Sequence, residues 1–517
     1  MEYLVAIDAG TIGCRTIIFD EEGREVSRAY EEYLSIYPQP TWVEQRADDW
    51  WRAACNTMKR SLSQAKISAD KVAGVSVTNQ RETIVPVNEN GTPLRNAIVW
   101  QDRRTIKECT LIREAVGSEK IYKITGLTID PYFSAPKILW IKKNEEEIFE
   151  KTYKFMLVHD YLLMKLTGEF ITDWSNASRT MLFDIEKFEW SNAICDALEI
   201  PLEKLPRAEP PAKKIGEITM EASKVTGLKV GTPVITGGGD QQCGAVGIGV
   251  VKEGRIKATT GTGTFILAYS KKPMWDKKMR VLCSCHADPG KWVIEASIFT
   301  TGAVYRWFRD QLGHTEKALA DILEEDPYNI LNREAEAAPP GSGGILFLPH
   351  FVGAGAPYWN PNSRGVIFGL ALGHTRKHLI RALMEGVCFE IRKNIDVMKQ
   401  MGISINEMRI TGGATRSDLW NQIQADVYNL PVVIGTIEEA TALGAAILAG
   451  VGSGVYRSVS EAAEKIVHIK ERKNPDPVKR EIYDKLYRLH LELYDALNEK
   501  GLFAKLTEIA DFIQKQS

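Results

Sequence analysis

Residues 3–20 read YLVAIDAGTIGCRTIIFD and decide how the chain begins to fold. The apolar run at 3–8 predicts a buried strand, and the run at 16–19 predicts a second strand that returns beside it. Between them lies a tight turn at 10–13, where glycine allows the backbone to reverse direction. Asp8 and Arg15 flank this turn, so one hairpin carries a carboxylate, a hydroxyl and a guanidinium.

A similar pattern restarts in the middle of the chain. Residues 255–259 predict a strand, 261–263 a tight turn, and 264–268 a return strand. A Gly-Thr hairpin therefore opens each half of the chain. Because strand and helix patterns alternate throughout, the sequence indicates an α/β architecture. We expect two related domains, residues 1–250 and 251–517, with a nucleotide held between them.

Several further elements can be placed from their patterns. A helix begins near Asp48, and a strand at 72–77 delivers the polar segment NQRE (residues 79–82) at its carboxyl end. A strand at 408–410 leads into a glycine turn and then a helix, for which Ser417 is a suitable N-cap. Residues 477–500 predict one charged amphipathic helix, followed by a helical tail.

Composition and charge exclude several classes of protein. The 517 residues include 65 Lys and Arg against 67 Asp and Glu, for a net charge of −2, so no basic face for nucleic acid is implied. No stretch approaches the ~18 continuous apolar residues that cross a bilayer. The first residues lack the basic start of a secretory signal. We therefore expect a cytoplasmic protein with no membrane or nucleic-acid partner.

The eight cysteines are scattered and show no disulfide rhythm. Cys283, Cys285 and His286 form a C-x-C-H cluster that can hold a metal in other contexts, but no second paired cluster accompanies it. Buried thiols without a structural metal are the expectation.

Four short glycine turns carry the chemical interpretation. The chain contains neither GxxxxGK[ST] nor GxGxxG after a strand, so the two commonest nucleotide loops are absent. Glycine turns nevertheless let backbone N–H groups approach phosphate oxygens. Taken singly, each turn is equally consistent with a purely structural role. The turns lie at residues 8–15, 236–242, 261–263 and 412–415.

The second of these turns places an acid after three glycines, as Gly237-Gly238-Gly239-Asp240. A general base must come within hydrogen-bond reach of the hydroxyl that it deprotonates. We expect the bare backbone to leave the Asp240 carboxylate open to a bulky ligand, so Asp240 is the candidate base.

Two longer segments complete the pattern, YFSAPKILW (residues 132–140) and the helical stretch 373–392. With the glycine turns in this order, the chain resembles the FGGY family of carbohydrate kinases from about residue 3 to about 490. Its first half is most similar to the glycerol kinase branch, and its second half also to the xylulose and autoinducer kinase branches. The resemblance implies two ribonuclease-H-like domains of the actin and sugar-kinase superfamily, with ATP and Mg²⁺ in the cleft. Close packing is the expected reason for Gly386 inside the helical stretch.

The resemblance also assigns roles residue by residue. It implies that Asp240 is the general base and that the polyol or sugar contacts Arg81, Glu82, Trp100, Tyr132, Asp240, Gln241 and Phe265. It implies that Mg²⁺ is positioned by Asp8 and Asp240. It implies nucleotide contacts at Thr11, Ile12, Gly13, Arg15, Thr262, Gly302, Arg306, Gly413 and Ser417.

The first turn departs from the family pattern. Glycerol kinases usually carry Gly-Thr-Thr-Ser-Ser-Arg there, whereas this chain has Ile12, Gly13 and Cys14 and so lacks three hydroxyl donors. Arg306 replaces a family Gln, and Ser417 an Asn. The loop at 224–233 has no matching Gly-Arg pattern, so regulation by fructose bisphosphate is not expected.

The resulting hypothesis is an ATP-dependent kinase that phosphorylates a terminal hydroxyl of a small polyol, with glycerol as the first choice. The alternative within the family is a ketose or related linear sugar. A non-catalytic actin-like ATPase is the alternative from a different class. Family habit predicts a homo-oligomer, either a dimer or a tetramer.

Overall fold

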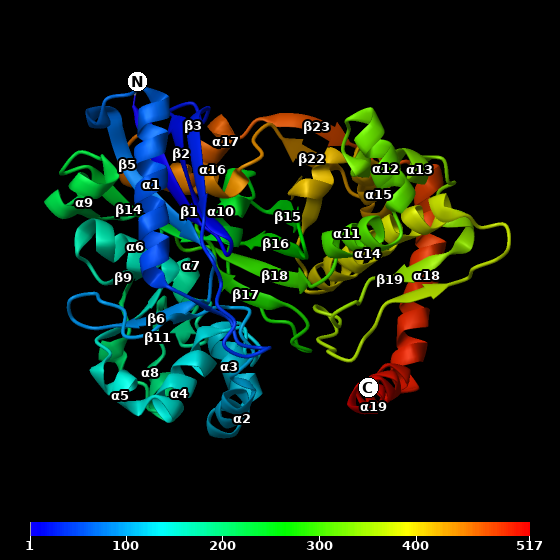
Figure 1. Ribbon diagram of the computed structural model, residues 1–517, viewed down its shortest axis with the longest axis horizontal. Helices are drawn as coiled ribbons and strands as arrows, with labels where there is room; N and C mark the ends of the chain where they lie inside the picture. Colours follow the sequence, from blue (N-terminus) through cyan, green and yellow to red (C-terminus); the bar gives the residue numbers. More distant parts are fainter. Residues whose placement is uncertain (1, 517) are drawn as a thin grey trace.

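The computed structural model describes residues 2–516, and two large β-sheets lie side by side in it (Figure 1). The first sheet has six strands in the order β13-β14-β5-β1-β2-β3, and the second has seven in the order β17-β18-β16-β15-β21-β22-β23. The strands of the first sheet are β1 (Tyr3–Ala9), β2 (Gly13–Asp20), β3 (Glu25–Glu32), β5 (Val72–Asn79), β13 (Lys214–Glu217) and β14 (Pro233–Gly239). Those of the second are β15 (Gly254–Thr260), β16 (Thr264–Ser270), β17 (Leu282–Cys285), β18 (Trp292–Ile298), β21 (Ile405–Thr411), β22 (Val432–Gly435) and β23 (Ile469–Lys473).

The two sheets repeat one pairing pattern. In the first, β1 pairs antiparallel with β2 across the Gly10 turn and parallel with β5 on its other side. In the second, β15 pairs antiparallel with β16 and parallel with β21. The predicted α/β fold built from two related units is confirmed, including a Gly-Thr hairpin at the start of each.

Helices cover both sheets, and their packing follows their apolar faces. On the first sheet, α1 contacts β2 and β3 while α6 contacts β5 and β14; on the second, α14 contacts β16 and β18 and packs against α15. The expected helix near Asp48 is α1, and Ser417 caps α15 by accepting a hydrogen bond from the Trp420 N–H. The bounds are α1 (Ala47–Ala65), α6 (Val158–Thr167), α7 (Trp174–Ala177), α9 (Met220–Thr226), α10 (Asp240–Gly247), α11 (Gly302–Gln311), α12 (His314–Leu323), α13 (Pro327–Glu336), α14 (Arg376–Gln400), α15 (Asp418–Tyr428), α16 (Ala440–Gly452), α17 (Val459–Ile466), α18 (Pro477–Glu499) and α19 (Leu502–Gln516).

A smaller layer hangs below the first sheet, drawn in cyan in Figure 1. It contains a four-stranded sheet in the order β4-β7-β6-β8 and has its own apolar core, which includes Phe133 and Ile138. This layer matters for the site because it supports Trp100 and Tyr132. Its elements are β4 (Glu44–Gln45), β6 (Ile84–Val87), β7 (Ala97–Ile98), β8 (Lys154–Leu157), α2 (Ile106–Ala115), α3 (Ser118–Thr125), α4 (Ser134–Asn144), α5 (Glu146–Lys151) and α8 (Asn192–Leu198).

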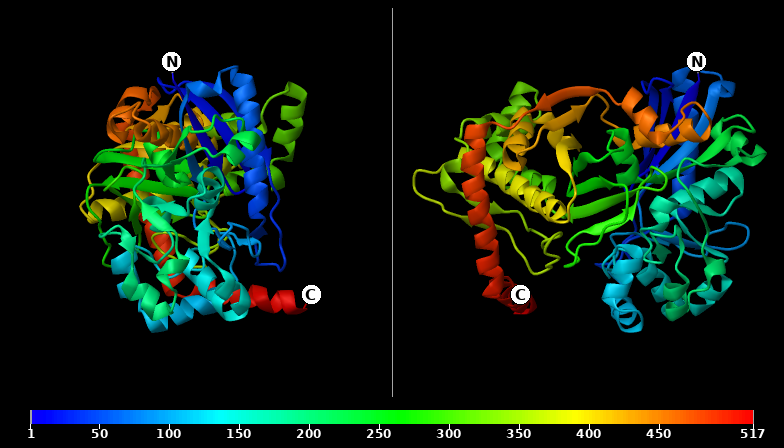
Figure 2. Two further views of the ribbon diagram at one scale, coloured as in Figure 1. Left: turned by 90° about the vertical axis from the view of Figure 1, so that its left-hand side faces the viewer. Right: turned by 180° about the vertical axis from the view of Figure 1, so that it is seen from behind.

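Late segments of the chain cross back to the first sheet. Helix α16 packs on β1, β5 and β14, and α17 follows it there, so the orange helices stand beside the blue strands in Figures 1 and 2. One apolar core joins Leu4, Phe19 and residues of α16 and α17. The domain division near residue 250 stays a prediction, with residues 440–466 contributing to the first unit.

Helices α10 and α16 cross at very short range. A Cβ on Gly247 would lie 1.8 Å from the carbonyl oxygen of Ala440, and one on Gly444 would lie 1.9 Å from that of Cys243. Only glycine fits at these two positions. The expectation for Gly386 is confirmed in the same way, because its Cβ would lie 2.2 Å from the carbonyl oxygen of Phe347.

None of the helices within residues 2–516 combines the length and the apolar character needed to span a membrane.

We predict that Gly444→Ala destabilises the protein. The added methyl group would force α16 away from α10, and overpacking of this kind costs roughly 1–3 kcal/mol. The higher helix propensity of alanine does not compensate for this cost. Urea denaturation measures the free energy of unfolding. Gly373→Ala is the control, since no atom lies within 4 Å of the added Cβ there. Equal stability of both variants would contradict the close contact.

Candidate active site

A cavity of about 440 Å³ opens between the two halves of the chain. Its walls come from the carboxyl end of β5, from the start of α10 and from the turn between β15 and β16. All the residues predicted to bind substrate line it, namely Arg81, Glu82, Trp100, Tyr132, Asp240, Gln241 and Phe265. Three of the residues predicted to contact the nucleotide, Thr11, Ile12 and Thr262, also line it.

Arg81 and Glu82 are held in the turn that follows β5. Glu82 has a φ of +65°, in the left-handed region that non-glycine residues rarely adopt. Such strain persists where the surroundings over-determine it, as they do at functional sites. Both side chains are buried, with Arg81 3% and Glu82 1% exposed, so their charges depend on partners inside the protein.

Those partners form a buried network that the sequence did not reveal. Arg81 Nη1 donates to Glu295 Oε2 at 3.0 Å and to Gln242 Oε1 at 3.1 Å, while its Nε lies 3.3 Å from Asp240 Oδ1. Arg179 Nε donates to Glu82 Oε1 at 2.6 Å. Although burial raises the pKa of Glu295, Arg179 and Arg81 hold it at about 2. The available signal was Glu295 as the single charged residue of the strand WVIEASI.

Asp240 is the first residue of α10, and its side chain is 32% exposed. Its Oδ1 accepts from the Gln241 backbone N–H at 2.7 Å, and Gln241 Nε2 lies 3.4 Å from Oδ2. The carboxylate is thus oriented from one side and open on the other. A ligand hydroxyl in the cavity can reach it.

The three glycines at residues 237–239 have a different structural role from the one expected. Residues 237–239 are buried in strand β14 and do not form an open loop. A Cβ on Gly237 would lie 1.7 Å from the Val77 carbonyl oxygen, and one on Gly239 would lie 2.5 Å from Arg81 Cδ. The prediction that these glycines clear space for a ligand is wrong, because they bring β14 against β5 and against Arg81.

Two aromatic rings form one wall of the cavity. Trp100 and Tyr132 meet edge to face with their centroids 5.5 Å apart. Trp100 Nε1 donates to Thr11 Oγ1 at 2.9 Å, so the Thr11 hydroxyl also has a partner within the protein. Burial raises the pKa of Tyr132, which keeps its phenol protonated and able to donate.

Lys257 lies behind the cavity residue Gln241 and is another residue that the sequence did not indicate. This buried residue of β15 donates from Nζ to Gln241 Oε1 at 2.7 Å. The contact fixes the Gln241 amide so that its NH₂ group points toward Asp240. Burial lowers the pKa of Lys257 to about 7, although the nearby Asp240 opposes the shift.

The hairpin departure at residues 12–14 has a steric explanation. A Cβ on Gly13 would lie 2.5 Å from the Glu31 carbonyl oxygen and 2.7 Å from the Tyr30 hydroxyl, so no side chain fits there. Cys14 is buried in the core beneath the sheet, and Ile12 is 68% exposed at the cavity. Side-chain hydroxyls at positions 13 and 14 would therefore not reach the cavity in this fold.

Asp8 and Arg15 face each other across the two strands of the hairpin and do not line the main cavity. Arg15 Nε is 3.6 Å from Asp8 Oδ2, and Arg15 Nη1 donates to Glu439, the residue before α16. Burial raises the pKa of Asp8 to about 7, although Arg15 opposes this. A carboxylate in such a place gains from a further cation.

A second cavity of about 260 Å³ adjoins the first and shares Gly261 with it. Tyr305 packs against Tyr328 and Trp420 in its wall, with ring centroids 5.1 and 5.3 Å apart. The structure brings together here four of the predicted nucleotide residues, Gly302, Arg306, Gly413 and Ser417. It adds polar groups that carried no recognisable sequence signal, Asp326, Asn329 and Asn332.

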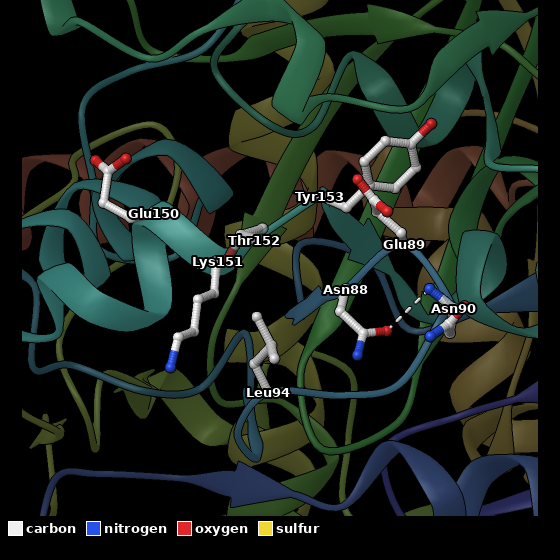
Figure 3. A pocket seen from close by; sticks show the side chains of 8 residues that line it. All are labelled: Asn88, Glu89, Asn90, Leu94, Glu150, Lys151, Thr152 and Tyr153. Atoms are coloured by element: carbon white, nitrogen blue, oxygen red, sulfur yellow. Dashed lines mark hydrogen bonds between the residues drawn. The ribbon is translucent and has the colours of Figure 1, made fainter.

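The remaining candidates lie elsewhere. All eight cysteines are buried, as expected, and His286 of the C-x-C-H cluster is hydrogen-bonded through Nε2 to the Val250 carbonyl oxygen at 2.8 Å. A third hollow of about 550 Å³ lies on the smaller layer (Figure 3). Its side chains Glu150, Lys151 and Tyr153 point in different directions, and it contains none of the predicted site residues.

The chain matches a known family over most of its length. Residues 3–247 match the N-terminal domain, and residues 256–453 the C-terminal domain, of the FGGY family of carbohydrate kinases. The chain belongs to the FGGY family of carbohydrate kinases. The FGGY membership, the two-domain sugar-kinase fold and an ATP-dependent phosphotransferase activity, all predicted from the sequence, are confirmed. A non-catalytic actin-like ATPase is set aside.

Relatives within the FGGY family include kinases of different substrates. The chain is 38% identical over 474 residues to "Glycerol kinase 2" of Thermotoga maritima, covering 90% of this chain and 92% of the relative. It superposes on xylulose kinase from Rhodospirillum rubrum with a TM-score of 0.88 and 28% identity, over 97% of this chain and 100% of that one. For Plasmodium falciparum glycerol kinase with ADP, the TM-score is 0.85 at 28% identity, over 95% and 98%.

We predict that Lys257→Met changes how stability depends on pH. Below pH 7 the Lys257 side chain of the wild type is protonated in both the folded and the unfolded state, so the free-energy cost of burying its charge is fully present. Between the folded pKa of about 7 and the ordinary value of 10.5, Lys257 is neutral in the folded state but protonated in the unfolded state. The free energy of unfolding of the wild type therefore rises with pH over this range. The free energy of unfolding of the variant, relative to wild type, therefore falls from pH 7 to pH 10.

Urea denaturation at both pH values measures this difference. Lys272→Met, at an exposed position, is the control and should show a flat difference. A flat difference for Lys257→Met as well would contradict the lowered pKa.

Proposed function

We propose that this FGGY kinase transfers the γ-phosphoryl group of ATP to a terminal hydroxyl of a small polyol, with glycerol as the preferred substrate. The observation that carries the proposal is the convergence of Arg81, Glu82 and Asp240 on one cavity, with Arg81 Nε 3.3 Å from Asp240 Oδ1. Relatives named glycerol kinase, 36–38% identical over about 90% of the chain, support it.

The cavity offers what a neutral polyol needs. Each hydroxyl both donates and accepts, so a guanidinium beside a carboxylate can hold two neighbouring hydroxyls at once. Arg81 would donate and Glu82 would accept, while the Tyr132 hydroxyl adds a donor. Trp100 and Phe265 would cover the carbon chain.

Asp240 would act on the attacking hydroxyl. Its carboxylate is open to the cavity and oriented by the Gln241 N–H. It would accept the proton as the hydroxyl oxygen attacks the γ-phosphorus in line with the leaving group. Gln241, held by Lys257, would keep the Asp240 carboxylate facing the cavity.

The nucleotide would lie across the second cavity, with its phosphates toward the shared Gly261. Gly302, Arg306, Gly413 and Ser417 would contact the base and ribose. The hairpin backbone at residues 11–13 and the Thr262 and Arg15 side chains would contact phosphate oxygens. The Ser417 hydroxyl already accepts from the Trp420 N–H at the start of α15, so it would contact the nucleotide as a donor.

Asp8 and Asp240 would hold Mg²⁺. Within residues 2–516 no group of three His, Cys, Asp or Glu is placed to bind a metal, so phosphate oxygens and water would complete the shell. This fits Mg²⁺, which keeps several waters and is bound through one or two carboxylates plus substrate phosphates. The raised pKa of Asp8 fits a carboxylate that gains from a nearby cation. Once bound, the ion would neutralise charge on the phosphates.

A linear ketose is the second candidate. The 440 Å³ cavity admits chains longer than a triol, and the chain superposes on a xylulose kinase with a TM-score of 0.88. The cytoplasmic location, the homo-oligomeric state and the lack of nucleic-acid partners stay predictions.

We predict that ADP release in the presence of ATP and Mg²⁺ is fastest with glycerol. A coupled ADP assay would compare glycerol with erythrulose, xylulose, ribulose and dihydroxyacetone, and EDTA would abolish the signal. Turnover of a ketose with none of glycerol would make the second candidate correct. Product analysis should find phosphate on a terminal oxygen.

We predict that Asp240→Asn lowers kcat by roughly 10²–10⁴-fold, the usual contribution of a general base. The fold should persist, because the amide matches the carboxylate in shape. Asp20→Asn, a buried carboxylate at the end of β2 that pairs with Arg24, is the control and should keep its activity. Near-native turnover by Asp240→Asn would remove Asp240 from the mechanism.

A further inference from the structure

We propose that Glu295 is a positioning residue for substrate, which holds Arg81 directly and Glu82 through Arg179. The inference rests on the proposed function of the same cavity. Glu295 does not itself line the cavity, so it acts through the residues that do.

Glu295 lies on β18 of the second sheet and is 1% exposed. Its carboxylate accepts from Arg81 Nη1 at 3.0 and 3.1 Å and from Gln242 Nε2 at 3.1 Å. It also lies 3.3 Å from Arg179 Nη1. Two guanidiniums from the first half of the chain are thus anchored on one carboxylate from the second.

Arg179 carries the anchorage on to Glu82. It follows α7, donates through Nε to Glu82 Oε1 at 2.6 Å and through Nη1 to Ser284 Oγ at 3.1 Å. Its guanidinium also lies 5.6 and 5.1 Å from the ring centroids of Tyr132 and Phe133. The planar fork therefore fixes both the carboxylate and the aromatic wall of the substrate cavity.

The charge balance explains why Glu295 is needed. Arg81 and Arg179 are each at most 3% exposed and face Glu82 and Glu295 as two buried pairs. Without the Glu295 charge, two guanidiniums would share Glu82, and Arg81 would be drawn toward Asp240, already 3.3 Å from its Nε. The donors and acceptors that grip the polyol would then lose their relative orientation. Nucleotide binding, in the adjoining cavity, would not change.

The test is a steady-state comparison of wild type, Glu295→Gln and Arg179→Lys, with KM measured separately for the polyol and for ATP. Each variant should raise the polyol KM roughly 10- to 100-fold, the size carried by a hydrogen bond to a charged group. The ATP KM should stay within about twofold of wild type, which a general loss of structure would not produce.

Glu385→Gln is the matched control. Glu385 is 1% exposed and accepts from Arg381 Nε and from the Tyr483 hydroxyl, both at 2.8 Å, but lines neither cavity. It should lower the melting temperature without raising the polyol KM.

The activity of the wild type distinguishes a failure of the role of Glu295 from a failure of the proposed function. If wild type turns over a polyol and both variants keep its KM, the role of Glu295 is overturned and the proposed function stands. If Glu295→Gln does not fold, Arg179→Lys decides alone. If wild type acts on no polyol or sugar, the proposed function fails and the role of Glu295 in substrate binding falls with it.

Discussion

The close crossing of α10 and α16 is the constraint on which the rest of the molecule depends. Two backbones meet there with no room for a methyl group on Gly247 or Gly444. Helix α16 packs on β1, β5 and β14, while α10 contacts both β14 and β16, so the crossing lies between the two sheets, and Asp240 is the first residue of α10. The close packing of these two helices therefore also fixes where the Asp240 carboxylate lies.

Buried charge is the second organising principle. Arginine and glutamate side chains would be unstable in a dry interior if either were left alone. Here they occur as interlocked pairs, of which Arg81 and Glu82 line the main cavity while Arg179 and Glu295 lie behind them. The arrangement gives rigid donors and acceptors at the surface of the cavity, while the side chains that hold them do not line it. Preorganisation of this kind is what binding and phosphoryl transfer both require.

Much of the fold could be predicted from the sequence because its strands are apolar and bounded by glycine. The hairpin at 3–20, strand β5 and the capped helix α15 all lie where their patterns indicated. The cavity residues were found through motifs that are local in the chain. Arg179 and Glu295 were not, because their partners lie 97 and 214 residues away and no local pattern records such pairs.

The three glycines at residues 237–239 show in another way what could not be predicted from the sequence. From the sequence, residues 237–239 indicated an open loop, since glycine is the usual residue of loops. The structure uses them in a buried strand, where the neighbouring strand and Arg81 occupy the space of a side chain. Local propensity could not reveal this, because the obstacle comes from elements far away in the chain.

The return of residues 440–466 to the first sheet bears on how the protein is made. Leu4, Ala6, Ile17 and Phe19 present one face of that sheet to α16 and α17. These strands emerge early from the ribosome, whereas the helices that cover them emerge only near the end of synthesis. The first half of the nascent chain therefore carries an uncovered apolar face through most of translation, and its folding is completed by the second half.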